Sequence, residues 1–271
     1  MKSNPMGRIL SEFKRSTVPK TLTIDNSGTE NAMASTLACD NFLFELISKN
    51  ALACDCSSIQ EVSLVRGQTL FEKEERLRHV YFPTTSIVSR IYRAKCGHTA
   101  EMGMVGREGV VGISLFLWDD QANNEAIVHA EGRAVLMEAS AALEAFRQCG
   151  PFQVAVLRYA RSVISQLRQI AVCNRLHCTK QRLCRWLLMT LDRTPTDEIG
   201  LSHDFIGQLL SVRRESITCA LSHLQSEGLV QTSNRRIKVL NRAGIEATAC
   251  ECYGVINSDY DRLVADRNAN S

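Results

Sequence analysis

The chain has 271 residues, of which 45% are hydrophobic, and a formal net charge of +3. This length suits one or two globular domains that each bury a core, and the small net charge excludes a polycation. No apolar run is long enough to span a membrane, and the N-terminus lacks the pattern of a secretory signal. We therefore expect a cytoplasmic protein without a membrane partner, whose eleven cysteines stay reduced.

The N-terminal part of the chain predicts a tail followed by one helix. Residues 1–36 are rich in Ser, Thr, Asn and Lys and show no sustained period, which predicts a disordered tail. Residues 37–50 predict a short amphipathic helix with Leu43, Leu46 and Ile47 on one side.

The next segment has the sequence pattern of a β domain. From Ile59 to Met137, short runs of β-forming residues alternate with glycine or polar turns, which predicts a β-sandwich or roll. Pro83 lies inside an apolar run and therefore marks a strand end or an edge. We expect residues 37–150 to form one effector or sensor domain.

Residues 151–177 predict a long helix, for which Pro151 suits the first helical position. One set of apolar residues has the alternating four- and three-residue spacing of a two-stranded coiled-coil seam: Val156, Ala160, Val163, Leu167 and Ile170. A second apolar stripe lies beside it: Leu157, Ile164 and Ala171. Two apolar faces favour a helix that packs on its own domain and on a partner helix, and we assign the first set to the dimer seam. The alternative is a helix buried wholly within one domain.

Residues 178–250 predict a winged helix-turn-helix, and residues 251–271 form a C-terminal extension. Thr179 is the expected N-cap of the first helix, and Arg182 stands where a capping box would need Glu or Gln. Ser202 is the expected N-cap of a second helix, in which Gly207 permits a close helix crossing.

The third helix of this segment carries apolar residues at i, i+3, i+4 and i+7: Ile217, Ala220, Leu221 and Leu224. Gly228 ends the helix, and two short β runs around Ser233-Asn234 predict a hairpin or wing. A helix-turn-helix followed by a wing is a DNA-reading arrangement.

The polar residues of this segment suit a DNA interface. Residues 179–242 contain ten Lys and Arg against six Asp and Glu, a local excess that favours a polyanionic partner. Arginine pairs with guanine in a bidentate way and a carboxylate accepts from cytosine, so we assign base readout to the start of the third helix: Arg213, Arg214, Glu215, Ser216 and Cys219. Phosphate contacts are assigned to Ser202, His203, Arg235, Arg236 and Lys238. The alternative is a solvated helix end.

These residues resemble the Crp/Fnr family of bacterial transcription regulators. The family pattern of a small polar residue, an Ile-Gly pair and then Arg-Glu-Ser/Thr-Val/Ile is matched by Ser202, by Ile206-Gly207 and by residues 214–217. The resemblance extends over roughly residues 40–250. It implies an α+β protein with a jelly-roll-like N-terminal β-roll (a double-stranded β-helix), a long dimerisation helix and a winged helix-turn-helix.

The resemblance also implies a function. A homodimer would bind double-stranded DNA at a near-palindromic operator, with half-sites about 34 Å apart. RNA polymerase is a candidate further partner. By analogy with the family, Arg214 and Glu215 read bases, while Cys219 stands where the family usually has a third base-reading arginine.

The β-roll departs from family members that bind cyclic nucleotides. Their Gly-Glu pair falls near Gly112-Ile113, and their Arg followed by Ser or Thr falls near Asn124-Glu125. No arginine lies between Arg107 and Arg133. We therefore expect no binding of cyclic AMP in the usual mode.

The cysteines leave cofactors open, although we expect none. Iron–sulfur members of the family use closely spaced N-terminal cysteines, whereas this chain has Cys39, Cys54, Cys56 and Cys96 without a C-x-x-C pair. Cys173 and His177 are one helical turn apart and suit metal ligands, but we favour small buried residues at helix contacts. Neither an iron–sulfur cluster nor haem is excluded, so a redox- or metal-responsive regulator is one alternative.

Two other classes of function fit the sequence less well. The sequence has no nucleophile elbow, Walker loop, pair of catalytic carboxylates or His-rich metal motif, so we expect no enzyme and assign no catalytic residue. A ligand-binding module without DNA binding is a second alternative, against which the Arg-Arg-Glu helix and the basic wing both argue.

Overall fold

A computed structural model describes residues 40–49, 58–117, 120–148 and 150–269. The predicted tail, residues 1–36, and Cys39, Cys54 and Cys56 lie outside the described residues. The chain divides into two compact units, one within residues 1–88 and 105–156 and the other formed by residues 89–104 and 157–271.

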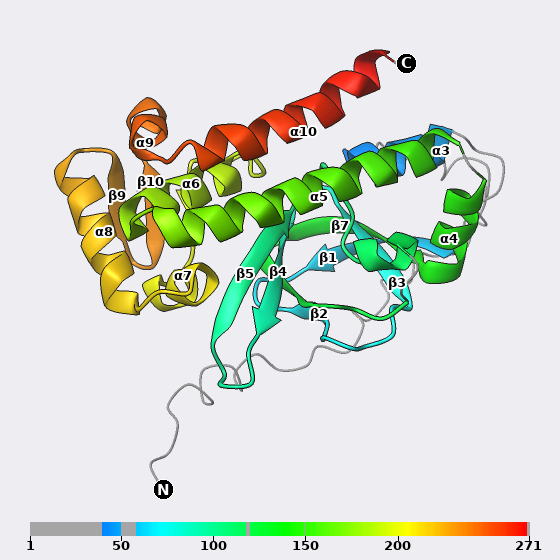
Figure 1. Ribbon diagram of the computed structural model, residues 1–271, viewed down its shortest axis with the longest axis horizontal. Coiled ribbons are helices and arrows are strands. Elements are labelled where there is room, and N and C mark those ends of the chain that lie inside the picture. Colours follow the sequence, from blue (N-terminus) through cyan, green and yellow to red (C-terminus); the bar gives the residue numbers. More distant parts are fainter. Residues whose placement is uncertain (1–39, 50–57, 118–119, 149, 270–271) are drawn as a thin grey trace, which may run out of the picture. The chain divides into compact units, whose positions relative to one another are not determined.

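The fold is mixed α+β, with most strands in the first half of the chain and most helices in the second (Figure 1). The first half contains α3 (Phe42–Lys49), β1 (Ile59–Leu64), β2 (Thr69–Phe71), β3 (His79–Pro83), β4 (Ile87–Arg93), β5 (Thr99–Val105), the 3₁₀ turn η2 (Ile113–Leu117), β6 (Glu125–Ala130), β7 (Gly132–Glu138) and α4 (Ala139–Arg147). The second half contains α5 (Pro151–Leu176), α6 (Thr179–Leu191), β8 (Glu198–Ile199), α7 (His203–Leu210), α8 (Arg214–Ser226), β9 (Val230–Ser233), β10 (Arg236–Val239), α9 (Arg242–Thr248) and α10 (Cys252–Ala269). The strands form three sheets, with orders β1-β7-β3, β2-β6-β4-β5 and β8-β10-β9.

The first unit contains an antiparallel sheet in which β7 lies between β1 and β3. The register pairs Val62 with Ala134 on one side of β7, and Phe82 with Val135 on the other. Phe82 and Val135 are buried, so this sheet supplies part of the core. Pro83 ends β3, as predicted, because a proline has no N–H to donate to a ladder.

Helix α3 packs into the first unit through an asparagine. Its observed start, Phe42, is later than the predicted residue 37, because the Asn41 side chain accepts hydrogen bonds from the backbone N–H groups of Leu43 and Phe44. The Asn41 amide also donates to the carbonyls of Pro83 and Gly109. Leu43 is buried as predicted.

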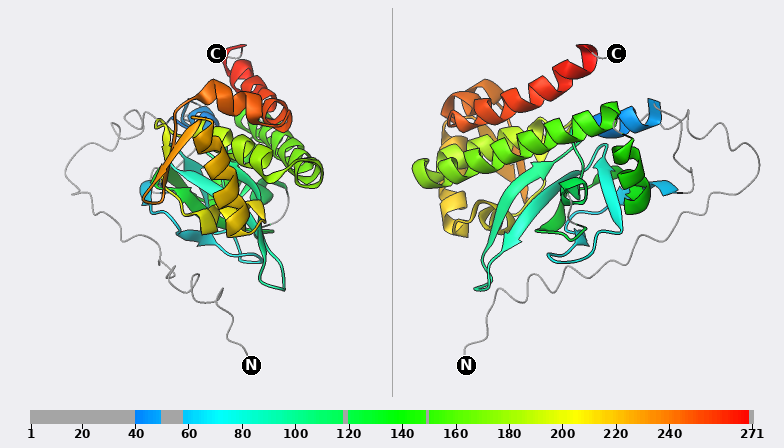
Figure 2. Two further views of the ribbon diagram at one scale, coloured as in Figure 1. Left: turned by 90° about the vertical axis from the view of Figure 1, so that its left-hand side faces the viewer. Right: turned by 45° about the vertical axis from the view of Figure 1, so that its right-hand side comes forward.

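The second unit contains most of the long hairpin of β4 and β5, which Figure 2 shows as a twisted ribbon. Its turn is closed by a hydrogen bond from the Ala94 N–H to the His98 carbonyl. Gly103 in β5 has φ +134°, and a Cβ atom there would lie 2.0 Å from Gln166 Oε1. Only glycine fits at this approach of β5 to α5.

Helix α5 buries the face that was predicted to be the dimer seam. Val156, Ala160, Val163 and Ile170 are all buried in the single chain, and Leu167 is half-buried. The neighbouring stripe is the exposed one, since Leu157 and Ile164 are about half exposed. The seam assignment therefore has to be corrected, because residues that already pack on their own chain are not available to a partner.

The N-cap of α6 and the loop of the wing also differ from prediction. Helix α6 is capped by Cys178 rather than Thr179, and the Cys178 N–H donates to Gln181 Oε1, so Gln181 supplies the reach-back bond of a capping box. The two-residue hairpin loop of the wing is Asn234-Arg235, both with positive φ, rather than Ser233-Asn234.

No helix among the described residues is both long and apolar enough to cross a membrane.

Candidate functional site

Helix α8, which precedes the wing, exposes one polar face. Its buried side consists of Ile217, Ala220, Leu221 and Leu224, the four residues predicted from their spacing. One row of exposed residues contains Arg214, Glu215, Thr218, Cys219 and Ser222, and His223, Gln225 and Ser226 are exposed beside it. The positions in the row follow i, i+1, i+4, i+5 and i+8, so they form one continuous strip along the helix. The hydrogen-bond donors and acceptors of this strip can contact a partner without displacement of any buried residue.

The turn before α8 holds the strip in place. Ser211 caps the end of α7 with φ +53°, and the Val212 N–H donates to the Gly207 carbonyl. A Cβ atom at Gly207 would lie 3.0 Å from the Val212 carbonyl oxygen and 3.5 Å from the Arg214 nitrogen. The close approach predicted for Gly207 is confirmed, and it fixes where α8 begins relative to α7.

The predicted base-reading residues occupy different positions on α8. Arg213 is exposed at the N-cap, and its carbonyl accepts a hydrogen bond from the Ser216 N–H. Arg214 and Glu215 are exposed in the first turn, where a carboxylate also suits the positive end of the helix dipole. Ser216 is half-buried, whereas Cys219 is exposed one turn further along.

The start of α7 adds a second row of polar groups. The Ser202 hydroxyl accepts a hydrogen bond from the Phe205 N–H, so Ser202 is the N-cap as predicted. His203 Nδ1 lies 3.0 Å from Thr218 Oγ1. Burial lowers the pKa of His203, and the nearby Arg214 guanidinium lowers it further, so both effects favour the neutral imidazole.

The wing carries the three predicted phosphate-binding cations. Arg236 lies 3.6 Å from Glu198, and Lys238 lies 3.6 Å from Asp197. Arg235 is exposed in the hairpin loop and forms no ion pair within the described part of the chain. Arg235 is therefore the wing cation that is most available to a phosphate.

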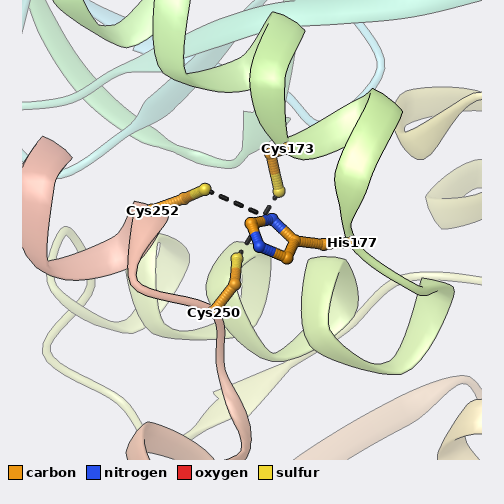
Figure 3. Close-up of side chains that lie close together, drawn as sticks. All are labelled: Cys173, His177, Cys250 and Cys252. Carbon is orange, nitrogen blue, oxygen red and sulfur yellow. Dashed lines mark hydrogen bonds between the residues drawn. The ribbon is translucent and has the colours of Figure 1, made fainter.

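A separate cluster of ligand-type side chains lies at the end of α5. Figure 3 shows Cys173, His177, Cys250 and Cys252 pointing toward one another, and their ligand atoms all lie within 4.8 Å of one another. Cys173 and His177 share a face, as their spacing suggested. Sequence reasoning missed Cys250 and Cys252, although their C-x-C spacing near a Cys-x-x-x-His pair was a usable signal.

The cluster is buried and electrostatically unusual. Cys173, Cys250 and Cys252 are each at most 4% exposed, and His177 is largely buried. The hydrogen bond between Cys250 and Cys173 lowers the pKa of Cys173 to about 5 and raises the pKa of Cys250 above its ordinary value. Cys184 is also buried but lies outside the cluster, and burial raises its pKa to about 12.

Comparisons with known proteins agree with this geometry. Residues 181–248 match the Crp-like helix-turn-helix domain family. The transcriptional regulator LdrP of Thermus thermophilus is 28% identical over 201 residues, which cover 68% of this chain and 94% of LdrP.

Two solved structures have the same fold. FixK2 from Bradyrhizobium japonicum has a TM-score of 0.62 and 17% identity, and the match covers 71% of this chain and 98% of FixK2. TTHB099, a CRP-family transcriptional regulator from Thermus thermophilus, has a TM-score of 0.58 and 20% identity, covering 69% of this chain and 96% of that one.

The α7–α8 pair with its wing and these similarities define the class: the protein is a transcription regulator with a helix-turn-helix DNA-binding domain. Within that class, its helix-turn-helix domain is of the Crp-like kind, and its fold is that of the CRP-family regulator TTHB099. Its curated relatives are transcriptional regulators.

Proposed function

We propose that the protein binds a near-palindromic operator as a homodimer and reads its sequence with α8. The observation that carries this proposal is the exposed strip of α8, which begins with Arg214 and Glu215 and is backed by a fully buried apolar face. The second helix of a helix-turn-helix lies in the major groove with its first turn against base edges. Arg235 on the wing would contact a phosphate, and Arg213 at the N-cap, which we also assigned to base readout, would contact either a base or a phosphate.

The dimer is supported by the outward face of α5. Five of the large hydrophobic residues that remain exposed belong to this helix: Val154, Leu157, Ile164, Val172 and Leu176. Leu157 and Ile164 are one heptad apart, and Ala171 continues the row. A row with this period buries itself against the same row of a second copy. A two-fold dimer also matches a palindromic operator, because each copy reads one half-site.

The signal sensed by the β-roll is not cyclic AMP in its usual mode. The segment that aligns with the phosphate-binding residues of cyclic-nucleotide receptors carries Asn124 and Glu125 instead of an arginine. The carboxylate of Glu125 would repel a phosphate, so the domain senses a different signal.

The readout assignment is tested with a double variant, Arg214→Ala with Glu215→Ala. Each lost base contact removes about 1–3 kcal/mol of discrimination, so the variant should bind the operator and a scrambled fragment almost equally. The measurement is a mobility-shift titration on both fragments at one fixed salt concentration, after selection of the operator from a random library.

Arg235→Ala is the matched control on the wing. It should weaken binding to both fragments alike and reduce the slope of log K against log salt by about 1.8 for a dimer, since two phosphate contacts are lost. A double variant at Arg214 and Glu215 that is folded and keeps the wild-type preference would refute the readout assignment.

A further inference from the structure

The Cys173–His177–Cys250–Cys252 cluster joins two parts of the second unit that are far apart in sequence. Cys173 lies in the last turns of α5, and His177 follows that helix directly. Cys250 lies between α9 and α10, and Cys252 is the first residue of α10. Cys173 and Cys250 are therefore brought together across 77 residues of chain.

Two distances in the cluster are close to those around a single tetrahedral metal ion, and all four ligand atoms lie within 4.8 Å of one another. Cys173 Sγ lies 3.5 Å from Cys250 Sγ, and Cys252 Sγ lies 3.4 Å from His177 Nδ1. Bonds of about 2.3 Å to sulfur and 2.1 Å to nitrogen place two sulfur ligands of one zinc ion ~3.8 Å apart, and a sulfur and a nitrogen ~3.6 Å apart. A disulfide would instead need the two sulfurs at about 2.05 Å.

Neighbouring residues orient the His177 ring so that its Nδ1 atom can bind a metal ion. His177 Nε2 lies 3.3 Å from a carboxylate oxygen of Glu251, so the proton of the neutral ring belongs on Nε2. That leaves the lone pair of Nδ1 directed at the sulfur atoms (Figure 3). A carboxylate that holds the second nitrogen of a metal-binding histidine is a frequent outer partner of zinc sites. The Gln169 amide similarly donates to Cys252 Sγ at 3.1 Å, a contact that suits a charged sulfur.

Buried positive charge faces the cluster from α6. Arg182 and Arg185 are 8% and 3% exposed, and the Nε atom of each is buried without a hydrogen-bond partner. Arg182 interacts electrostatically with Cys173 and Cys250, and Arg185 interacts with Cys173. Three thiolates around one divalent ion leave a net charge of −1, which offsets part of the +2 charge of these two guanidinium groups. Arg185 also interacts with the Glu101 carboxylate, whereas the groups that interact favourably with Arg182 are Cys173 and Cys250, so neutral thiols would remove the counter-charge of Arg182.

We propose that Cys173, His177, Cys250 and Cys252 bind one zinc ion in a closed, structural site. Four protein ligands leave no open position for a substrate or water, which is the arrangement of structural rather than catalytic zinc. Three sulfurs and one imidazole select zinc by ligand type and geometry. An iron–sulfur cluster is a poorer fit, because its cysteines bind different iron atoms and must stand further apart than ligands that share one ion.

The first test uses the wild-type, full-length protein purified under reducing conditions without chelator. Elemental analysis should find about one zinc per chain. The protein stripped of zinc and reloaded with Co²⁺ should show the intense visible bands of tetrahedral cobalt bound by thiolates. Iron with sulfide in place of zinc, or a Cys173–Cys250 disulfide with no metal, would overturn the proposal. So would stripped, folded protein that binds neither Zn²⁺ nor Co²⁺ at one per chain.

The second test uses variants to locate the site. Cys252→Ser and His177→Ala should each lower the zinc content at least tenfold after dialysis against a weak chelator. Cys184→Ser is the matched control, because Cys184 is equally buried but lies outside the cluster, and it should keep one zinc. A folded Cys252→Ser protein with full zinc content would overturn the assignment of the ligands. If a ligand variant does not fold, the cobalt spectrum of the wild-type protein decides.

Discussion

Glu101 shows how one buried residue can hold distant segments of the second unit together. Its carboxylate accepts a hydrogen bond from the Ser89 hydroxyl at 2.5 Å and another from Trp186 Nε1 at 2.9 Å. Ser89 is in β4, Glu101 in β5 and Trp186 in α6, and all three side chains are buried. Burial raises the pKa of Glu101, although both hydrogen bonds and the nearby Arg185 and Arg90 oppose that rise.

This residue gives a pH dependence with a definite sign. Below the ordinary pKa of 4.5 the carboxyl is protonated in the folded and unfolded states alike. As the pH rises from there to the raised folded pKa, the unfolded chain ionises first, so the free energy of unfolding falls. We expect Glu101→Gln, which keeps an acceptor for Trp186, to lose this part of the decline.

The measurement is urea denaturation of both proteins at pH 5 and at pH 8. The difference in unfolding free energy between Glu101→Gln and the wild type should shift in favour of the variant at pH 8. Other titrating groups, including the cysteine cluster, are common to both proteins and cancel in this difference. Parallel pH profiles for the two proteins would contradict the prediction.

At the scale of elements, α5 shows what hydrophobic spacing can predict and what it cannot. The sequence shows two apolar stripes on this helix, and their spacing alone does not say which one faces its own chain. Burial decides the question: Val163 is 6% exposed, whereas Ile164, the next residue, is 55% exposed. The proposed dimer contact therefore moves to the stripe of Leu157 and Ile164.

A charge on that stripe should separate the dimer. We expect Leu157→Asp with Ile164→Asp to yield a folded monomer, since two pairs of carboxylates would face each other in the interface. Operator affinity should fall by about 10²–10⁴-fold, because one molecule no longer engages both half-sites. Sedimentation and a mobility-shift titration measure the two effects.

Val65→Asp is the control for adding a charge at an exposed apolar residue. Val65 is 63% exposed and lies outside α5, so this variant should remain a dimer. A double variant at Leu157 and Ile164 that still sediments as a dimer would place the contact elsewhere.

At the scale of the whole molecule, the proposed metal site ties the end of α5 to the start of α10. The same compact unit contains α8, which we propose reads the operator, and the wing. A ligand that binds the folded chain alone stabilises it by about 2.7 kcal/mol at one hundred times its Kd. Loss of the metal should therefore destabilise the unit that binds DNA.

Thermal melting with and without chelator tests this effect. Removal of the metal should lower the Tm by roughly 5–10 °C, and added Zn²⁺ should restore it, whereas Mg²⁺ should not. A chelator saturated with zinc beforehand controls for direct effects of the chelator. An unchanged Tm after elemental analysis has verified metal loss would argue against a structural role.

The sequence by itself determined the winged helix-turn-helix. The apolar spacing from Ile217 to Leu224, the Ser202 cap and the small residue at Gly207 all act through neighbours within a few residues, so their pattern can be read along the chain. The β texture of residues 59–137 likewise predicted strands, although not their order in the sheets.

Only the tertiary structure decided which face of α5 is buried and which cysteines meet. Spacing within a helix shows that two stripes exist, but the rest of the fold determines which one is covered. Cys173 and His177 carry a local signal, yet Cys250 and Cys252 reach them only because the end of α5 and the segment before α10 come together in the fold. The contacts of Cys250 and Cys252 with Cys173 and His177 depend on the packing of the entire unit, because no pattern in the residues between them predicts these contacts.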